Sequence, residues 1–153
     1  MTRDELKDMI GKEVGTSKWF AIDQSRIDAF ADVTEDWQYI HVDPDKARDS
    51  PFGTTIAHGF LTLSMLSAMV YDGGPEIEGT VMGVNYGFDK VRFVSPVTEG
   101  ARVRAVFTLN AVEEKGPNEI QTTMGVVVEI EGAVKPALVA EWLGRRYFAE
   151  AAA

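Results

Sequence analysis

The pattern of hydrophobic and polar positions changes once along the chain, near residue 79. Beyond this point apolar residues recur at every second position in four stretches, which is typical of β-strands that bury one face. Glycine- and proline-containing turn signals separate the stretches, so the pattern predicts an antiparallel meander of four long strands. The four predicted apolar faces are Met82, Val84, Tyr86 and Phe88; Ala101, Val103, Ala105, Phe107 and Leu109; Ile120, Thr122, Met124, Val126, Val128 and Ile130; and Ala137, Val139, Leu143 and Tyr147.

Helical spacing dominates before residue 71. Asp23 is a candidate N-cap for a helix with apolar positions at Ile27, Phe30, Ala31 and Thr34, and a further strand is expected over residues 13–22. The segment 59–71 is apolar nearly all round, which predicts a helix buried on most sides. Together these elements predict an α+β fold, in which a five-stranded antiparallel sheet covers one long central helix.

Residues 35–57 lack any periodicity and contain Pro44, Pro51 and Gly53. We predict a long loop here, with one helical turn over residues 45–48. Loops of this length in compact domains are usually functional, so this loop is the first place to look for chemistry.

Composition and charge narrow the classes of function. The 153 residues predict a single domain over 1–153, and 45% hydrophobic with 25% charged residues is ordinary for a globular protein. The absence of cysteine excludes disulfides, thiolate metal sites and a cysteine nucleophile. A net charge of -9 argues against nucleic-acid binding. The apolar stretches are too short for a membrane span and the N-terminus does not resemble a signal peptide, so a cytoplasmic location is expected.

The chain has only two histidines, His41 within the loop and His58 at its end. Asp36 and His41 could share a water molecule as acid and base, and Gly59 opens the apolar helix, where a backbone N–H could stabilise an oxyanion. Structural roles compete with this interpretation. A loop histidine often only packs, Asp36 could cap a turn, and Gly59 could serve close packing. His41, Asp43 and His58 also match, by residue type alone, a metal site of two histidines and one carboxylate, an interpretation that we do not favour.

Three ordered motifs resemble those of the MaoC-like family of R-specific enoyl-CoA hydratases and dehydratases. Residues 30–44, FADVTEDWQYIHVDP, resemble its hydratase motif, in which an aspartate and a histidine five residues apart form the catalytic pair. Residues 56–59, IAHG, and residues 90–100, with Pro96 and Gly100, resemble the other two motifs. Gln38-Tyr39 stands where the family usually has Asn-Pro, which is similar to the nodulation-protein-N-like branch.

This resemblance implies a hot-dog fold and a homodimer joined at the sheet edges. It implies hydration of a trans-2-enoyl-CoA thioester to the (R)-3-hydroxyacyl thioester, with no cofactor and no metal. Asp36 and His41 would be catalytic, the Gly59 N–H would hold the thioester oxygen, Gln38 would orient the site and Ser67 would support the aspartate. His58 is interpreted mainly as a packing residue.

Two other functions stay open at this point. A hot-dog thioesterase would use the same ligand, but such enzymes place an acidic residue on or near the central helix, and residues 59–70 contain none. A non-catalytic module that binds acyl thioesters is the second. Coenzyme A phosphates would need basic partners, for which the candidates are Lys90, Arg92, Arg102, Arg104, Arg145 and Arg146.

Overall fold

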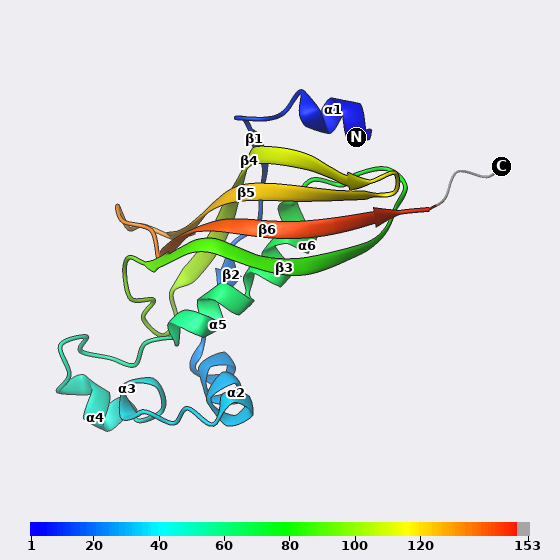
Figure 1. Ribbon diagram of the computed structural model, residues 1–153. Helices are drawn as coiled ribbons and strands as arrows, with labels where there is room; N and C mark the ends of the chain where they lie inside the picture. Colours follow the sequence, from blue (N-terminus) through cyan, green and yellow to red (C-terminus); the bar gives the residue numbers. More distant parts are fainter. Residues whose placement is uncertain (150–153) are drawn as a thin grey trace.

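A curved antiparallel sheet covers a central helical segment in the computed structural model, which describes residues 1–149 (Figure 1). Residues 150–153, the last four of the predicted domain, lie outside the described residues. In chain order the elements are α1 (Arg3–Lys7), β1 (Glu13–Thr16), β2 (Phe20–Ala21), α2 (Gln24–Thr34), α3 (Tyr39–Val42), α4 (Pro44–Arg48), α5 (Gly59–Ser64), α6 (Leu66–Gly73), β3 (Thr80–Phe93), β4 (Arg102–Gly116), β5 (Glu119–Ile130) and β6 (Leu138–Phe148). The predicted α+β architecture is confirmed.

The strand order is β1-β4-β5-β6-β3, so the predicted four-strand meander is only partly correct. Strands β4, β5 and β6 form the meander, but β3 pairs with β6 at the far edge instead of with β4. The loop that follows β3 is hydrogen-bonded to segments other than β4. Ala57 N–H donates to the Val97 carbonyl, and Gly100 N–H donates to the Ile22 carbonyl. A loop held in this way crosses the end of the sheet and cannot form a tight hairpin.

The strand expected over residues 13–22 is divided in two, which makes six strands where five were predicted. Both β1 and β2 pair with β4, and residues 17–19 separate them. At the break, the Ser17 hydroxyl accepts a hydrogen bond from the Ala105 N–H at 3.0 Å, in place of a backbone carbonyl. The two short strands therefore occupy one edge position.

The central helix is interrupted at Met65 but keeps its direction. Met65 N–H donates to Leu61 O, and Met69 N–H donates to Met65 O, both at 3.0 Å, so α5 and α6 follow one another closely. Burial is one-sided, which corrects the prediction of a helix buried on most sides. The buried residues are Leu61, Thr62, Met65, Leu66 and Met69, whereas Phe60, Ser64, Ser67 and Tyr71 form an exposed stripe.

The buried residues of the last strand only partly match the predicted set. Ala137 and Leu143 are buried as predicted, and Leu138 and Ala140 also lie in the core with Trp142 packed against it, whereas the predicted Val139 and Tyr147 are only half-buried. Both faces of this strand are apolar, so alternation alone does not distinguish them. Glu141 interrupts the predicted set, and that interruption marks the outer face.

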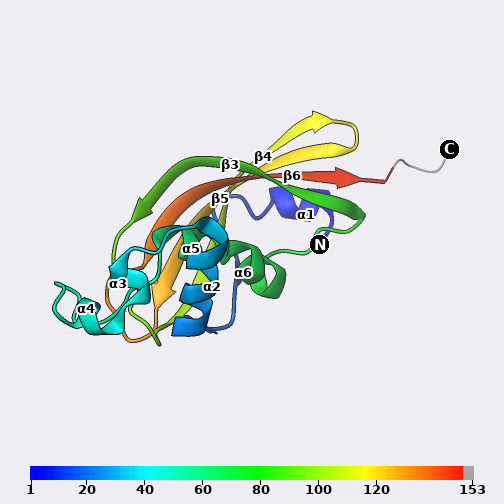
Figure 2. The same cartoon turned by 90° about the horizontal axis from the view of Figure 1, so that it is seen from below.

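Helices α2, α3 and α4 lie together beyond one end of the sheet, away from α1 (Figure 1, Figure 2). The Asp23 cap is confirmed, because its carboxylate accepts a hydrogen bond from Arg26 N–H at 2.9 Å. The predicted helical turn is present as α4, but the preceding turn, α3, was not predicted. Among residues 1–149, no helix combines the length and the apolar composition that crossing a membrane requires.

Candidate active site

The chain turns sharply at the end of α2, and this turn sets the position of Asp36. Glu35 has a left-handed backbone, with φ of 57°, and caps the helix by donating its N–H to Ala31 O. Asp36 N–H donates to the same carbonyl at 3.1 Å. A non-glycine residue in this conformation carries strain, and such strain is common beside functional groups. The turn leaves the Asp36 carboxylate about half exposed, at 54%.

His41 lies in α3, is 7% exposed and has a defined tautomer. Its Nδ1 is 2.7 Å from the Ile56 carbonyl oxygen. Because a carbonyl only accepts, Nδ1 carries the proton, and the neutral ring keeps its lone pair on Nε2. Burial lowers the pKa of His41, and the nearby His58 ring lowers it further, against the opposite effects of the Ile56 carbonyl and Asp36. His41 is therefore a neutral base near pH 7.

A second hydrogen-bond chain holds the backbone of His41, and the sequence analysis did not find it. The Gln24 side-chain amide donates to the His41 carbonyl at 2.7 Å, and its oxygen accepts from the buried Thr55 hydroxyl at 2.6 Å. Gln24 therefore connects α2 to both ends of the loop. Its place directly after the Asp23 cap is the only sequence signal for this role.

His58 joins the two predicted catalytic residues. Its Nε2 donates to the Asp36 carbonyl oxygen at 3.0 Å and lies 3.9 Å from the carboxylate. Its ring stacks on His41, with centroids 3.8 Å apart, and its other neighbour is Phe30 at 5.0 Å. The His58 Nδ1 is buried and has no hydrogen-bond partner among residues 1–149. His58 packs as predicted, and it also fixes the Asp36 backbone.

Asp36, His41 and His58 converge, with one ionisable atom of each within 4.8 Å of the others. Two groups at this separation can bind one water molecule between them, since each hydrogen bond spans about 2.8 Å. The two imidazole rings are stacked with their planes 23° apart, and His58 Nε2 carries a proton that it donates to the Asp36 carbonyl. This arrangement fits proton transfer better than it fits a shared metal ion.

Gly59 and Gln38 flank this group. Gly59 is the first residue of α5, directly after His58, and no backbone hydrogen bond within the described chain uses its N–H. A Cβ at this position would lie 3.0 to 3.2 Å from ring atoms of Phe93. Gln38 precedes α3, and its carbonyl accepts the His41 N–H at 2.9 Å. The Gln38 side chain is exposed and makes no hydrogen bond with any residue of the described part.

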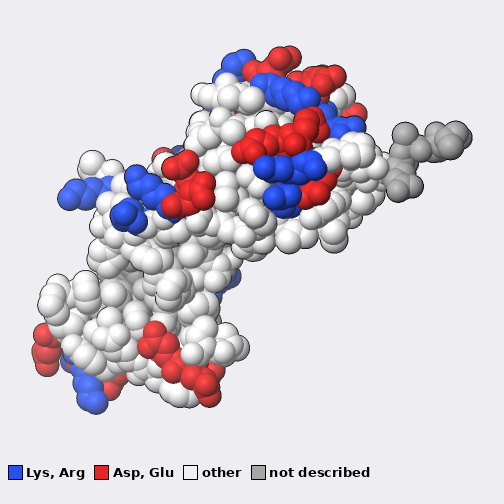
Figure 3. All heavy atoms as spheres, in the orientation of Figure 1, with Lys and Arg blue, Asp and Glu red and all other residues white. Residues whose placement is uncertain are grey.

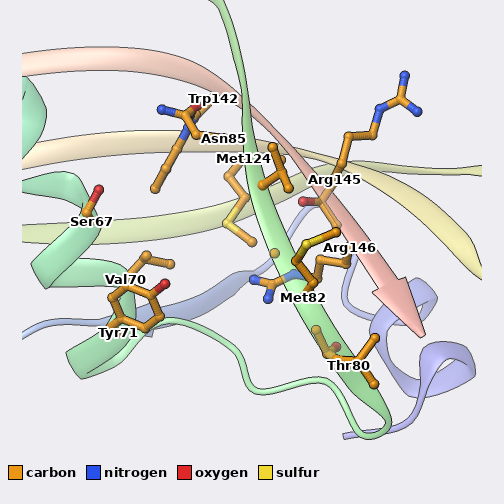
Figure 4. A pocket seen from close by; sticks show the side chains of 15 residues that line it. Ser67, Val70, Tyr71, Thr80, Met82, Asn85, Met124, Trp142, Arg145 and Arg146 are labelled. Carbon is orange, nitrogen blue, oxygen red and sulfur yellow. Dashed lines mark hydrogen bonds between the residues drawn. The ribbon is translucent and has the colours of Figure 1, made fainter. Parts of the chain in front are cut away.

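Ser67 is not brought to Asp36 within this chain. It lies on the exposed face of α6 and lines a cavity between that helix and strands β3 and β6 (Figure 4). No hydrogen bond joins Ser67 to Asp36 in the region from 1 to 149. Its predicted support of the aspartate therefore stays a prediction.

The charged residues on the face seen in Figure 3 gather largely on the outer side of the sheet. Three of the arginines suggested for coenzyme A have acidic partners. Arg102 is 3.4 Å from Glu131, Arg104 is 2.7 Å from Glu129, and Arg145 pairs with Glu119. Arg146 differs from these and lines the cavity beneath α6.

Comparison with known proteins identifies the family. The family model described as MaoC like domain matches residues 5–131, which carry Asp36, His41, His58 and Gly59. The chain belongs to the MaoC-like dehydratase family. It is 52% identical over 140 residues to Nodulation protein N of Rhizobium leguminosarum bv. viciae, covering 91% of this chain and 87% of the relative. It is 46% identical over 141 residues to 3-hydroxyacyl-thioester dehydratase Z of Mycobacterium tuberculosis, covering 92% and 93%.

Structural similarity extends over the same length. The (R)-hydratase from A. caviae involved in PHA biosynthesis superposes with a TM-score of 0.71 and 24% identity, over 88% of this chain and 94% of that chain. The predicted resemblance to the MaoC-like family and the predicted hot-dog fold are both confirmed. The MaoC-like hydratases and dehydratases add or remove water, and a site with one exposed carboxylate and one neutral imidazole suits that chemistry.

Proposed function

We propose that this MaoC-like protein catalyses the R-specific hydration of a trans-2-enoyl-CoA to the (R)-3-hydroxyacyl-CoA, or the reverse dehydration. The observation that carries the proposal is the tautomer of His41. Its Nδ1 is committed to the Ile56 carbonyl, so Nε2 is a free base beside the Asp36 carboxylate. The relatives that dehydrate 3-hydroxyacyl thioesters and the fold shared with an (R)-hydratase support the same reaction.

In the proposed mechanism, Asp36 and His41 hold one water molecule between them. His41 Nε2 removes a proton as the water oxygen bonds to the β-carbon of the enoyl group, and Asp36 orients the water and stabilises the imidazolium. A proton is then delivered from this pair to the α-carbon. One water molecule is consumed, its hydroxyl on the β-carbon and its second proton equivalent on the α-carbon, so the reaction needs neither metal nor cofactor.

Negative charge develops on the thioester oxygen during this step. We assign its stabilisation to the Gly59 N–H, which begins the helical segment and has no backbone acceptor among residues 1–149. Removal of one such donor typically costs about 3 kcal/mol of transition-state stabilisation.

The ultraviolet absorbance of the conjugated enoyl thioester tests the reaction directly. When the protein is added to crotonyl-CoA, we expect the absorbance of the enoyl thioester to fall as the substrate is hydrated. The product should be 3-hydroxybutyryl-CoA, and no free thiol should appear. Release of free CoA would identify a thioesterase instead. Binding without turnover would identify an acyl-thioester binding module.

The protonation state of His41 predicts the pH dependence. Because burial lowers the pKa of His41 below its ordinary value of about 6.5, the neutral base persists to more acidic pH than a free imidazole would. We expect kcat/KM to be flat near neutral pH and to fall by about tenfold per pH unit below the His41 pKa. A midpoint above pH 7 in the acidic limb of the profile would contradict the assignment of His41 as the base.

We also propose a homodimer. Strand β3 is a free edge of the sheet, and both of its faces are largely exposed, with Val81, Met82, Val84 and Tyr86 each more than 40% accessible. A long apolar edge strand is an aggregation hazard unless another strand covers it. Pairing of β3 with β3 of a second copy would remove this hazard. The exposed Phe60 and Tyr71 on the neighbouring helix face extend the apolar surface.

Light scattering at micromolar protein concentration is expected to give twice the mass of one chain. Val84→Lys, which adds a charge to the exposed edge, should shift the protein toward monomers, while Val134→Lys on an exposed turn should not. A monomeric wild-type protein would disprove the dimer.

A further inference from the structure

Helix α3, which carries His41, is too short to hold its own shape. It has four residues, and an isolated helix of this length is not stable in water. The side chain of its N-cap residue, Gln38, makes no capping hydrogen bond. The position of His41 therefore depends on neighbours outside α3, which are helix α2 beside it (Figure 2) and the loop residues 55–56.

Gln24 provides the contact from α2. The carbonyls in the last turn of a helix have no partner within that helix, and the His41 carbonyl accepts a hydrogen bond from Gln24 Nε2 at 2.7 Å. The same nitrogen donates to the Asp28 carboxylate at 2.8 Å, and Gln24 Oε1 accepts from the Thr55 hydroxyl at 2.6 Å. Both N–H bonds of the amide and its oxygen are therefore in use.

These partners require an amide in one orientation. The His41 carbonyl and the Asp28 carboxylate can only accept, so both must face the NH₂ group, and the amide oxygen must face Thr55. Glutamate has the same shape but offers no donor when ionised, and methionine has a similar length but offers no N–H. Neither side chain can replace the amide of Gln24.

The Thr55 end of this hydrogen-bond chain leads to the ring of His41. Thr55 is 1% exposed, and the next residue, Ile56, contacts α3 twice. The Ile56 carbonyl accepts from His41 Nδ1 at 2.7 Å, and the Ile56 N–H donates to the Ile40 carbonyl at 2.9 Å. Gln24 thus joins the backbone of His41 to the segment that binds its ring, and the hydrogen bonds form a closed loop.

We infer that Gln24 is a positioning residue for His41. Its amide holds the His41 backbone where Nδ1 reaches the Ile56 carbonyl, which leaves Nε2 free beside Asp36. Displacement of a catalytic group by about 1 Å can lower a rate by about 100-fold. The catalytic consequence rests on the proposed hydration reaction, whereas the geometry of His41 can be measured without turnover.

Nitrogen-15 NMR of the imidazole rings measures this geometry, and the chain has only two histidines to assign. In the wild-type protein we expect His41 to carry its proton on Nδ1. In Gln24→Met the ring should exchange between tautomers, and its pKa should rise toward the ordinary value of about 6.5 as water reaches it. The other titratable groups that act on His41 are His58 and Asp36, and Asp28 lies behind Gln24. Gln24→Met changes none of them.

Turnover should follow the ring. We expect Gln24→Met to lower kcat for crotonyl-CoA by about 10–100-fold with little change in KM, because Gln24 acts through His41 and not on substrate binding. Gln24→Glu should lose as much, since it removes both donors. Thr55→Val removes one hydroxyl at nearly constant shape and should lower kcat by about threefold. Thr55→Ser keeps the hydroxyl and should keep both kcat and the ring signals.

Gln121→Met is the matched control. Gln121 is 8% exposed, lies in β5, and its side-chain oxygen accepts from Arg145 Nε at 2.9 Å. Its replacement removes a comparable glutamine hydrogen bond at a distance from the loop, and should leave the His41 signals and kcat unchanged. A change in His41 that Gln121→Met reproduces would therefore reflect general destabilisation and would overturn the inference.

The ring signals decide the result independently of activity. Unchanged His41 signals in Gln24→Met would overturn the inference, whatever the turnover. If Gln24→Met does not fold, unchanged signals in Thr55→Val would overturn it instead. A wild-type protein that fails to hydrate crotonyl-CoA would disprove the proposed function, and the His41 signals of the variants would still show whether Gln24 positions the ring.

Discussion

Asp36→Asn and His41→Gln are each expected to lower the hydration rate of crotonyl-CoA by about 10²–10⁴-fold. The neutral amide that replaces the Asp36 carboxylate cannot stabilise an imidazolium, and the amide that replaces the His41 ring offers no base. Because the two residues act on one water molecule, the double variant should be little slower than the slower single variant. Steady-state turnover at pH 7.5, measured from the loss of enoyl absorbance, gives all three rates.

A charge-matched control lies in the same part of the chain. Asp45 is exposed on α4, and its one ion pair in the described part of the chain is with Arg48, at 3.0 Å. Asp45→Asn should therefore keep wild-type turnover. Circular dichroism should report unchanged folding of Asp36→Asn, whose side chain is half exposed. Near wild-type activity in either Asp36→Asn or His41→Gln would remove that residue from the proposed mechanism.

Gly59→Ala is expected to reduce turnover by about tenfold or more, which corresponds to about 1.4 kcal/mol in the barrier. The added methyl group would lie 3.0 to 3.2 Å from three ring atoms of Phe93, so either the ring or the first turn of α5 must shift. A shift of a few tenths of an ångström moves the N–H away from the thioester oxygen. Phe93→Leu relieves this crowding, and the Gly59→Ala/Phe93→Leu double variant should recover part of the lost rate.

His58→Ala provides the comparison for Gly59→Ala. The ring packs between Phe30 and His41 and donates to the Asp36 carbonyl, so its removal should lower the free energy of unfolding by roughly 2–4 kcal/mol. Below its melting temperature, however, this variant should keep more turnover than Asp36→Asn. If His58→Ala is folded but inactive and Gly59→Ala is fully active, His58 belongs to the catalytic set and the oxyanion is held elsewhere.

Local patterns in the sequence predicted the elements better than their arrangement. The Asp23 cap and the period-2 strands follow from near neighbours, and the structure contains both. Strand β3 pairs with β6, and the loop after β3 is hydrogen-bonded to Ala57 and Ile22, which are distant in sequence. No local pattern encodes these contacts. The buried residues of the last predicted strand were predicted only in part, because both faces are apolar: Ala137 and Leu143 are buried as predicted, whereas Val139 and Tyr147 are not. The exposed stripe of the central helix was missed because overall apolarity does not indicate which side finds a neighbour within one chain.

In the candidate site too, local spacing predicted some residues, whereas contacts between distant residues were not predictable. A motif with a five-residue spacing identified Asp36 and His41, and the structure brings their side chains together. The hydrogen bond from Gln24 to the His41 carbonyl joins two elements across the loop, and spacing could not predict it.

The turn at Glu35 and the loop that follows carry the candidate site, and the free energy needed to open this region differs from that of the sheet. Helices α3 and α4 lie outside the sheet. They are held through Gln24, Ile56 and the His58 ring, and the end of the loop adds one isolated bridge between Ile56 and Thr98 instead of a strand ladder. Regions attached by so few bonds open at a lower free-energy cost than a hydrogen-bonded ladder does. Native-state hydrogen exchange would therefore class residues 35–57 as a subglobal unit that can unfold while the sheet stays intact. In mild denaturant, loss of activity would then precede loss of the fold.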